Sequence, residues 1–375
     1  MSVAVVGAAE AGLGEAPPGT TPAELMGQAS LAALAEAGLT TDDVDGLFAS
    51  STQLPWASIN LGEELGIAPR VSDSTMLGGA SPVAHLAHAR AAILAGACEV
   101  ALIAYGSTQR SVGRANASPQ EVDRYEAPYR PVLPITAYAL AASRHMHEFG
   151  TTPEQLAWVA VSARRWAQRT PGAWSTKPLT VQDVLDAPRV CDPLGVKDCC
   201  LVTDGGGALV VVAEARARAL AAEGAPPPVH LLGVAEAHRH RHVSSMPDLV
   251  RTAAADSGAR AYAMAGVGPA DVQCAQLYDA FTITPILFAE DLGLCAKGEG
   301  GAFFEGGRTG PDGDGLPVNT NGGGLSYAHA GMNGLQLLVE GVRQVRAGRD
   351  VALVHANGGV FSAQATAILG SAATA

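Results

Sequence analysis

One pattern of glycine turn, helix and strand occurs twice in this sequence, and it constrains the fold more than any other feature. Residues 78–106 begin with two glycines, continue as a helix that ends at Ala95-Gly96, and finish in VALIAYG. Residues 322–358 begin with three glycines, continue as a helix that ends at Ala347-Gly348, and finish in VALVHANG. The repeat predicts two similar α/β halves. Chance similarity in a chain with 44 glycines is the alternative.

We expect the halves at residues 1–225 and 226–375. The first half should carry a loop insertion around residues 107–150, because residues 107–133 are polar, contain proline and show no period. If the halves are true repeats, the helices after Gly79 and Gly324 should be antiparallel neighbours at the centre of the fold.

Local signals agree with an alternation of strands and helices. The apolar residues 2–9 are predicted as a first buried strand. In the next segment Thr21 is expected to cap a helix, with Glu24 as its capping-box partner and Gly38 as the stop.

Composition excludes several classes of partner. The net charge is −12, and no cluster of Lys and Arg is large enough to follow a nucleic-acid backbone. No apolar run reaches membrane-spanning length. The six cysteines form no CxxC pair, so we expect reduced thiols in a cytoplasmic protein.

The glycine turns are the first candidates for chemistry. Each turn places backbone amides at the start of a helix, where donors can stabilise a developing oxyanion. Because the pattern occurs twice, we expect the two turns to face one cleft, with a thioester bound between them. A tight turn that merely needs positive φ is the alternative.

Four segments in order resemble one family: GGAS before a helix and EVALIAYGS, LYDAFTITPILFAEDLGLCAKGEGGAFFEGG, LPVNTNGGGLSYAHAG, and VALVHANGG. They resemble the sterol-carrier-protein-x type of thiolase, and most of all the thiolase-like group that includes steroid side-chain retro-aldolases. The resemblance implies two αβ halves in five layers, α-β-α-β-α, and a homodimer. It also implies a small zinc-ribbon/OB-fold partner protein.

The resemblance also implies which residue stands where the family has its nucleophile, at the start of the helix in the first half. The family's reactive cysteine falls at Gly79 when counted back from the stop at Ala95-Gly96, so the acyl-enzyme route of a thiolase is closed. Ser81 matches a non-nucleophilic serine of the family, and the sequence places no base beside it. Gly79 and Ser81 are therefore assigned to oxyanion and substrate contacts.

Two further motifs supply candidate proton-transfer groups. Tyr278, in YDAF, matches the Asn or His with which the family helps to form an oxyanion site, and a phenol can donate a hydrogen bond or relay a proton. His329, in SYAHAG, matches the general-base histidine of the family's GHP motif, with Ala330 in place of proline. A core tyrosine and a surface histidine are the alternatives.

The end of the second half can be aligned with the family in two registers. His355 falls where thiolases place a second catalytic cysteine, although a shift of one residue would put Ala356 there. Asn357 and Gly358 are assigned to the oxyanion and substrate contacts beside it. Since its neighbours are apolar, a buried core role is the alternative for His355.

Other polar groups are interpreted as structural. His238, His240 and His242 alternate, but we expect a solvated strand end there and no metal site. The segment CAKGEGG lacks the strand-to-helix context of a phosphate loop, and we expect an irregular loop near the active site.

The predicted set is a base, oxyanion donors and no covalent nucleophile, which fits retro-aldol cleavage of a β-hydroxyacyl-CoA. No tightly bound cofactor is expected beyond the CoA of the substrate. An acyl-CoA acyltransferase of the Claisen type is one alternative. A non-catalytic thiolase-like subunit of a hetero-oligomer is the other.

Overall fold

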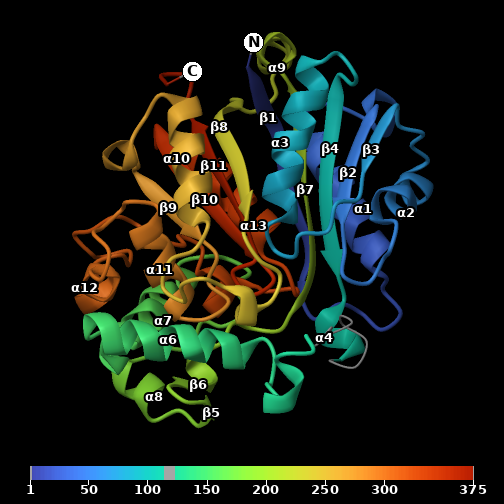
Figure 1. Cartoon of the computed structure of the whole chain (residues 1–375). Coiled ribbons are helices and arrows are strands. Elements are labelled where there is room, and N and C mark those ends of the chain that lie inside the picture. The colour runs from blue at the N-terminus through green and yellow to red at the C-terminus, as the bar shows by residue number, and fades with distance from the viewer. Residues whose placement is uncertain (1, 114–122, 375) are drawn as a thin grey trace.

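The computed structural model describes residues 2–113 and 123–374 (Figure 1). Its main sheet has nine strands in the order β3-β2-β4-β7-β1-β8-β11-β10-β9. The strands are β1 (Val3–Gly14), β2 (Gly46–Ser50), β3 (Val71–Asp73), β4 (Val100–Ser107), β7 (Asp204–Ala213), β8 (Val229–His238), β9 (Cys274–Leu277), β10 (Val351–Gly358) and β11 (Ala363–Gly370). A separate small sheet pairs β5 (Arg189–Cys191) with β6 (Leu194–Gly195).

The two halves of the main sheet share one topology. Strands β1, β7 and β4 are antiparallel in turn, and β4 lies parallel to β2, which lies parallel to β3. Strands β8, β11 and β10 are likewise antiparallel in turn, β10 lies parallel to β9, and Ala275 of β9 pairs in parallel with Val318. The duplicated α/β fold is thereby confirmed. The boundary at residues 225/226 stays a proposal, and it falls between α9 and β8.

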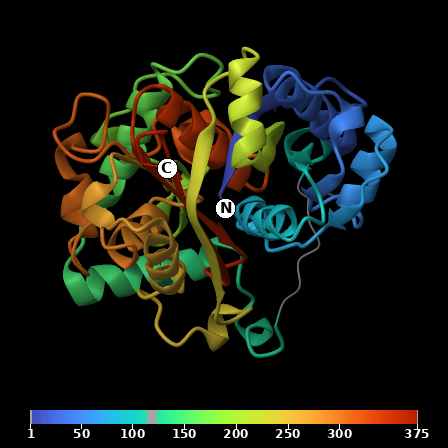
Figure 2. The ribbon, with the colours of Figure 1, turned by 90° about the horizontal axis from the view of Figure 1, so that it is seen from above.

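Helices complete the five layers. They are α1 (Pro22–Glu36), α2 (Ala57–Leu65), α3 (Ser81–Leu94), α4 (Gln109–Val112), α6 (Ile135–Phe149), α7 (Pro153–Ala167), α8 (Val181–Leu185), α9 (Glu214–Ala222), α10 (Ala254–Ala265), α11 (Ile283–Asp291), α12 (Gly300–Phe304) and α13 (Gly334–Arg346). Helices α3 and α13 contact strands of both halves and form the middle layer. Seen from above, α1 and α2 lie on one side and α10 and α11 on the other (Figure 2). No helix among residues 2–113 and 123–374 is long and apolar enough to cross a membrane.

The two central helices meet at their N-terminal ends. A Cβ atom at Gly334, the first residue of α13, would lie 2.1 Å from the carbonyl oxygen of Gly79, just before α3. The two helices are therefore the neighbours that the repeat predicted, and they meet end to end at their N-termini. Their antiparallel direction stays a prediction. Glycine at position 334 is what allows the backbones to approach so closely.

The connection between β4 and β7 distinguishes the halves. It holds α4, α6, α7, α8 and the small sheet, so it continues beyond the residue 150 that we expected as the end of the insertion. Its helices α6, α7 and α8, green in Figure 1, lie at one end of the sheet. Residues 114–122 of the predicted loop lie outside the described residues. In the second half, four residues join β10 to β11.

Candidate active site

Tyr278 and His329 form a buried pair. The Tyr278 hydroxyl lies 3.2 Å from Nε2 of His329, and the two rings meet edge to face at 79°. Tyr278 follows β9 directly, and its backbone N–H donates to the His355 carbonyl of β10. The backbone N–H of His329 donates to Thr203 Oγ1, and its carbonyl accepts from the Thr203 N–H. Hydrogen bonds of the backbone thus hold the two segments that carry these side chains.

The Tyr278 ring lies directly on Gly79. A Cβ atom at Gly79 would lie 2.3 Å from Cε2 of that ring and 2.5 Å from the carbonyl oxygen of Asn357. The position at which the resemblance puts a thiolase's cysteine has no room for any side chain. Gly358 is equally constrained, since its Cβ would lie 1.6 Å from the Leu77 carbonyl oxygen. The structure therefore brings Gly79, Tyr278, Asn357 and Gly358 together.

Ser81 lies fully buried beside this turn. Its hydroxyl accepts from the Leu77 N–H at 2.7 Å and lies 3.8 Å from the sulfur of Met76. Both contacts lie within the turn that begins α3. They indicate that Ser81 shapes the turn.

The second glycine turn does not present free amides. Asp279 accepts from the N–H groups of Gly324 at 2.7 Å and Leu325 at 3.1 Å, and Asn321 Oδ1 accepts from the Gly323 N–H at 2.8 Å. The prediction of two equivalent oxyanion turns was therefore wrong for this one. The Asp279 carboxylate is already the anion that this turn binds.

Burial sets the protonation of the site. It lowers the pKa of His329 to about 4, so the imidazole is neutral near pH 7. It raises the pKa of Tyr278 well above its usual value, so the phenol keeps its proton. Burial also raises the pKa of Asp279 to about 6, although its backbone hydrogen bonds oppose this. The pair is thus a neutral acceptor beside a protonated donor.

His355 lies behind the site in a different network. Its Nε2 lies 2.9 Å from Gln364 Oε1 and its Nδ1 lies 2.8 Å from Thr366 Oγ1. Gln364 donates to Asn357 Oδ1, and the Asn357 amide donates to the hydroxyl of Tyr138 at 2.9 Å. Both ring nitrogens of His355 are therefore engaged. This favours the core role, and a catalytic role for His355 stays a prediction.

Two further residues, Tyr138 and Cys200, lie beside the site without a sequence motif that marks them. Tyr138, on α6, stacks on Phe281 at 4.5 Å, and its hydroxyl donates to the Gly359 carbonyl. It lay within a predicted helix, where no local signal marks one aromatic residue as functional. Burial raises the pKa of Tyr138, as it does that of Tyr278, and the nearby Cys200 thiol contributes to both shifts. Burial also raises the pKa of Cys200 far above its usual value, so its thiol is not an activated nucleophile.

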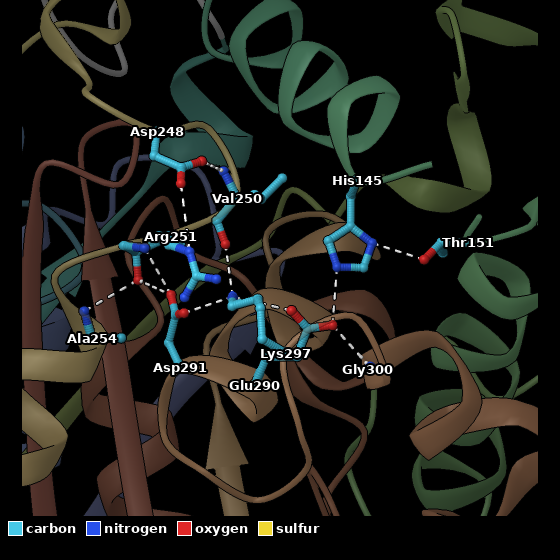
Figure 3. A network of polar contacts seen from close by, with 11 residues as sticks. His145, Thr151, Asp248, Val250, Arg251, Ala254, Glu290, Asp291, Lys297 and Gly300 are labelled. Carbon is cyan, nitrogen blue, oxygen red and sulfur yellow. Dashed lines mark hydrogen bonds and ion pairs between the residues drawn. The ribbon is translucent and has the colours of Figure 1, made fainter. Parts of the chain in front are cut away.

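A buried ionic network fixes the helices behind the site (Figure 3). Nε2 of His145, on α6, lies 2.9 Å from Glu290 Oε1, on α11. Nζ of Lys297 lies 3.0 Å from Glu290 Oε2 and 2.7 Å from Asp291 Oδ1. Since α6 carries Tyr138 and α11 follows the YDAF motif, the network holds two elements of the site together. Lys297 belongs to CAKGEGG, which forms the connection from α11 to α12.

Comparison with known proteins identifies the family. Residues 235–371 match the model of the thiolase C-terminal domain-like family. The chain is 34% identical over 374 residues to the 17-hydroxy-3-oxo-4-pregnene-20-carboxyl-CoA lyase of Mycobacterium tuberculosis, covering 91% of this chain and 93% of that protein. This chain belongs to the thiolase superfamily. Within it, the chain is a member of the thiolase-like sterol-carrier-protein-x group, as its motifs predict.

Further relatives of this thiolase-like protein include an aldolase and an acetyltransferase. It is 33% identical to the steroid side-chain-cleaving aldolase of Thermomonospora curvata, covering 92% of each chain. It is 31% identical to the acetyl-CoA acetyltransferase of Methanothermobacter thermautotrophicus, covering 90% of this chain and 91% of that protein. The solved structure of the Ltp2-ChsH2(DUF35) aldolase matches with a TM-score of 0.87 and 30% identity, over 99% of this chain and 98% of that one. The thiolase-like chain is therefore an enzyme that acts on acyl-CoA.

Proposed function

We propose that this thiolase-like enzyme cleaves a carbon–carbon bond of a β-hydroxyacyl-CoA by a retro-aldol reaction. The observation that carries the proposal is the buried Tyr278–His329 pair, which lies where Gly79 leaves no nucleophile. The lyase and aldolase names of the relatives support the same reaction.

The neutral imidazole of His329 is the proposed base. It removes the proton of the β-hydroxyl, the Cα–Cβ bond breaks, and the hydroxyl carbon leaves as an aldehyde or ketone. The electron pair of that bond forms the enolate of the thioester. The protonated phenol of Tyr278 donates a hydrogen bond to the enolate, and the His329 imidazolium gives its proton to Cα, which completes the acyl-CoA product and restores the neutral base.

The oligomer and partner belong to the proposal as well. We expect a homodimer in the cytoplasm, with no tightly bound cofactor beyond the CoA of the substrate. The aldolase structure joins Ltp2 to a second protein, ChsH2(DUF35), which supports the small partner protein that the resemblance implies.

An acyltransferase is the second candidate. His329 matches the family's general base, and one relative at 31% identity is an acetyl-CoA acetyltransferase. Acyl transfer through a covalent intermediate needs a nucleophile, however, and the Tyr278 ring occupies the space of a side chain at position 79.

Purified enzyme, with and without the candidate partner, should be given a β-hydroxyacyl-CoA, and carbonyl release should be followed. Release that His329→Ala abolishes is the expected result. Turnover seen only as acyl transfer to CoA would favour the acyltransferase. No turnover of either kind in the presence of the partner would favour a non-catalytic subunit.

A further inference from the structure

A cavity lies beside the proposed site. It has a volume of about 220 Å³ and lies between α7, residues 175–179 and residues 196–201. Its apolar wall includes Leu179, Leu201 and Leu325, and its two charged lining residues are Arg164 and Lys197. Leu325 belongs to the glycine turn that Asp279 binds, so the cavity adjoins the framework of the site.

Arg164 is a buried cation with neutral partners. Its residue is only 6% exposed. Nε donates to Ser326 Oγ at 2.9 Å and Nη1 donates to the Lys177 carbonyl at 2.8 Å. Among residues 2–113 and 123–374, no carboxylate pairs with this guanidinium. Buried charges are normally paired because desolvation is costly, so an unpaired arginine lining a cavity indicates an anionic ligand.

The carboxylates near Lys197 are engaged elsewhere. Asp198 accepts from the Gly195 N–H and from Thr282 Oγ1, each at 2.8 Å. Asp183 caps α8 by accepting from Thr180, and Lys197 makes only a minor contribution to lowering the pKa of Asp183. Lys197 itself is exposed and lines the cavity. Both charged residues that line the cavity are cations, in a chain whose net charge is −12.

We propose that this cavity binds a phosphate group, with Arg164 and Lys197 as the cations that hold it. Arginine has five N–H donors in a planar fork, and two of its nitrogens already fix its orientation through neutral partners. Two cations match the charge of a phosphate dianion better than that of a carboxylate. The phosphate comes either from the nucleotide end of an acyl-CoA or from a free phosphate compound.

The test measures binding of inorganic phosphate to the full-length protein by titration calorimetry at low ionic strength. Wild type should bind, and Lys197→Glu, an exposed change, should weaken binding about tenfold or more. Arg164→Gln should have at least as large an effect, provided that its circular dichroism matches wild type. The matched control is Arg218→Glu on α9, whose side chain is 75% exposed and which lies at the opposite end of the molecule from α8 (Figure 1).

Absence of phosphate binding to wild type, or equal binding to Lys197→Glu, would overturn the proposal. If saturating CoA displaces phosphate, the nucleotide end of the substrate is the source. If CoA leaves phosphate binding unchanged, a free phosphate compound is the source. Because these measurements need no turnover, they stand or fall independently of the retro-aldol function.

Discussion

The Tyr278 ring fills the space in which a side chain at position 79 would begin. A Cβ atom at Gly79 would lie 2.3 Å from Cε2 of that ring, so the bulky residue at one position requires glycine at the other. The lack of a nucleophile at position 79 and the presence of the Tyr278 phenol therefore depend on each other. A functional enzyme with this arrangement must work without an acyl-enzyme at residue 79.

Gly79→Ala should destabilise the protein and lower turnover. The added methyl group must displace the Tyr278 ring, and overpacking of this kind costs about 1–3 kcal/mol. Thermal unfolding and carbonyl release measure the two effects. Adding Tyr278→Ala should restore part of the lost stability, but not all, because the Asn357 carbonyl also lies 2.5 Å from the new Cβ. Unchanged stability in Gly79→Ala would contradict the packing described here.

His329→Ala and Tyr278→Phe should each lower turnover by about 10²–10⁴-fold, the usual cost of losing a positioned acid or base. The double variant should lose less than the product of the single effects, because both groups act on one transition state. Carbonyl release from a β-hydroxyacyl-CoA in the presence of the candidate partner is the measurement. If both single variants keep wild-type rates while folded, these residues are structural.

His355→Gln distinguishes a core residue from a catalytic one. Loss of the hydrogen bonds to Gln364 and Thr366 should lower the melting temperature, whereas kcat should stay within about threefold of wild type if His355 takes no part in proton transfer. His329→Gln is the matched control. A fall in kcat as large as that of the control would give His355 a catalytic role.

His85 should contribute to acid sensitivity. Burial lowers the pKa of His85 to about 4, although the nearby Asp73 carboxylate and the Thr75 backbone oppose this. The unfolded chain, with a histidine pKa of about 6.5, binds a proton first. The native state therefore loses up to about 1.4 kcal/mol per pH unit as the pH falls from about 6.5 to 4.

His85→Leu removes this effect. At pH 7 the variant should be as stable as wild type or about 1 kcal/mol more stable, because an apolar side chain replaces a buried polar ring. Its advantage should grow as the pH falls from 6.5 to 4, while the neighbouring residues His88, Asp73 and Glu236 are the same in both proteins. Denaturant unfolding at several pH values checks this, and parallel pH curves would refute it.

Lys297→Met should be strongly destabilising. Lys297 is only 15% exposed, and its removal leaves the buried carboxylates of Glu290 and Asp291 without their cation. Breaking a buried pair typically costs about 3–5 kcal/mol. Arg218→Met, in the exposed pair with Glu214, should change stability by less than about 1 kcal/mol. Denaturant unfolding of both variants is the measurement, and equal small effects would show that the network contributes little.

Local rules in the sequence determined much of the fold. Thr21 and Glu24 form the predicted capping box, with Glu24 donating its N–H to Thr21 Oγ1 at 3.2 Å. The repeated glycine–helix–strand pattern predicted the duplicated halves, because each unit depends on turn and period signals between near neighbours in the chain. The missing cysteine at Gly79 and the candidates Tyr278 and His329 were also readable from motifs.

The tertiary structure alone decided how these pieces meet. Only it shows that Asp279 occupies the amides of the second glycine turn, that α3 and α13 meet at their N-termini, and that His355 lies in a core network. The charge of Arg164 is visible in the sequence, but its burial without a carboxylate is not. Each of these facts depends on contacts between residues far apart in the chain. Whether a donor is free or a charge is paired is a property of the packed interior, which local sequence patterns do not encode.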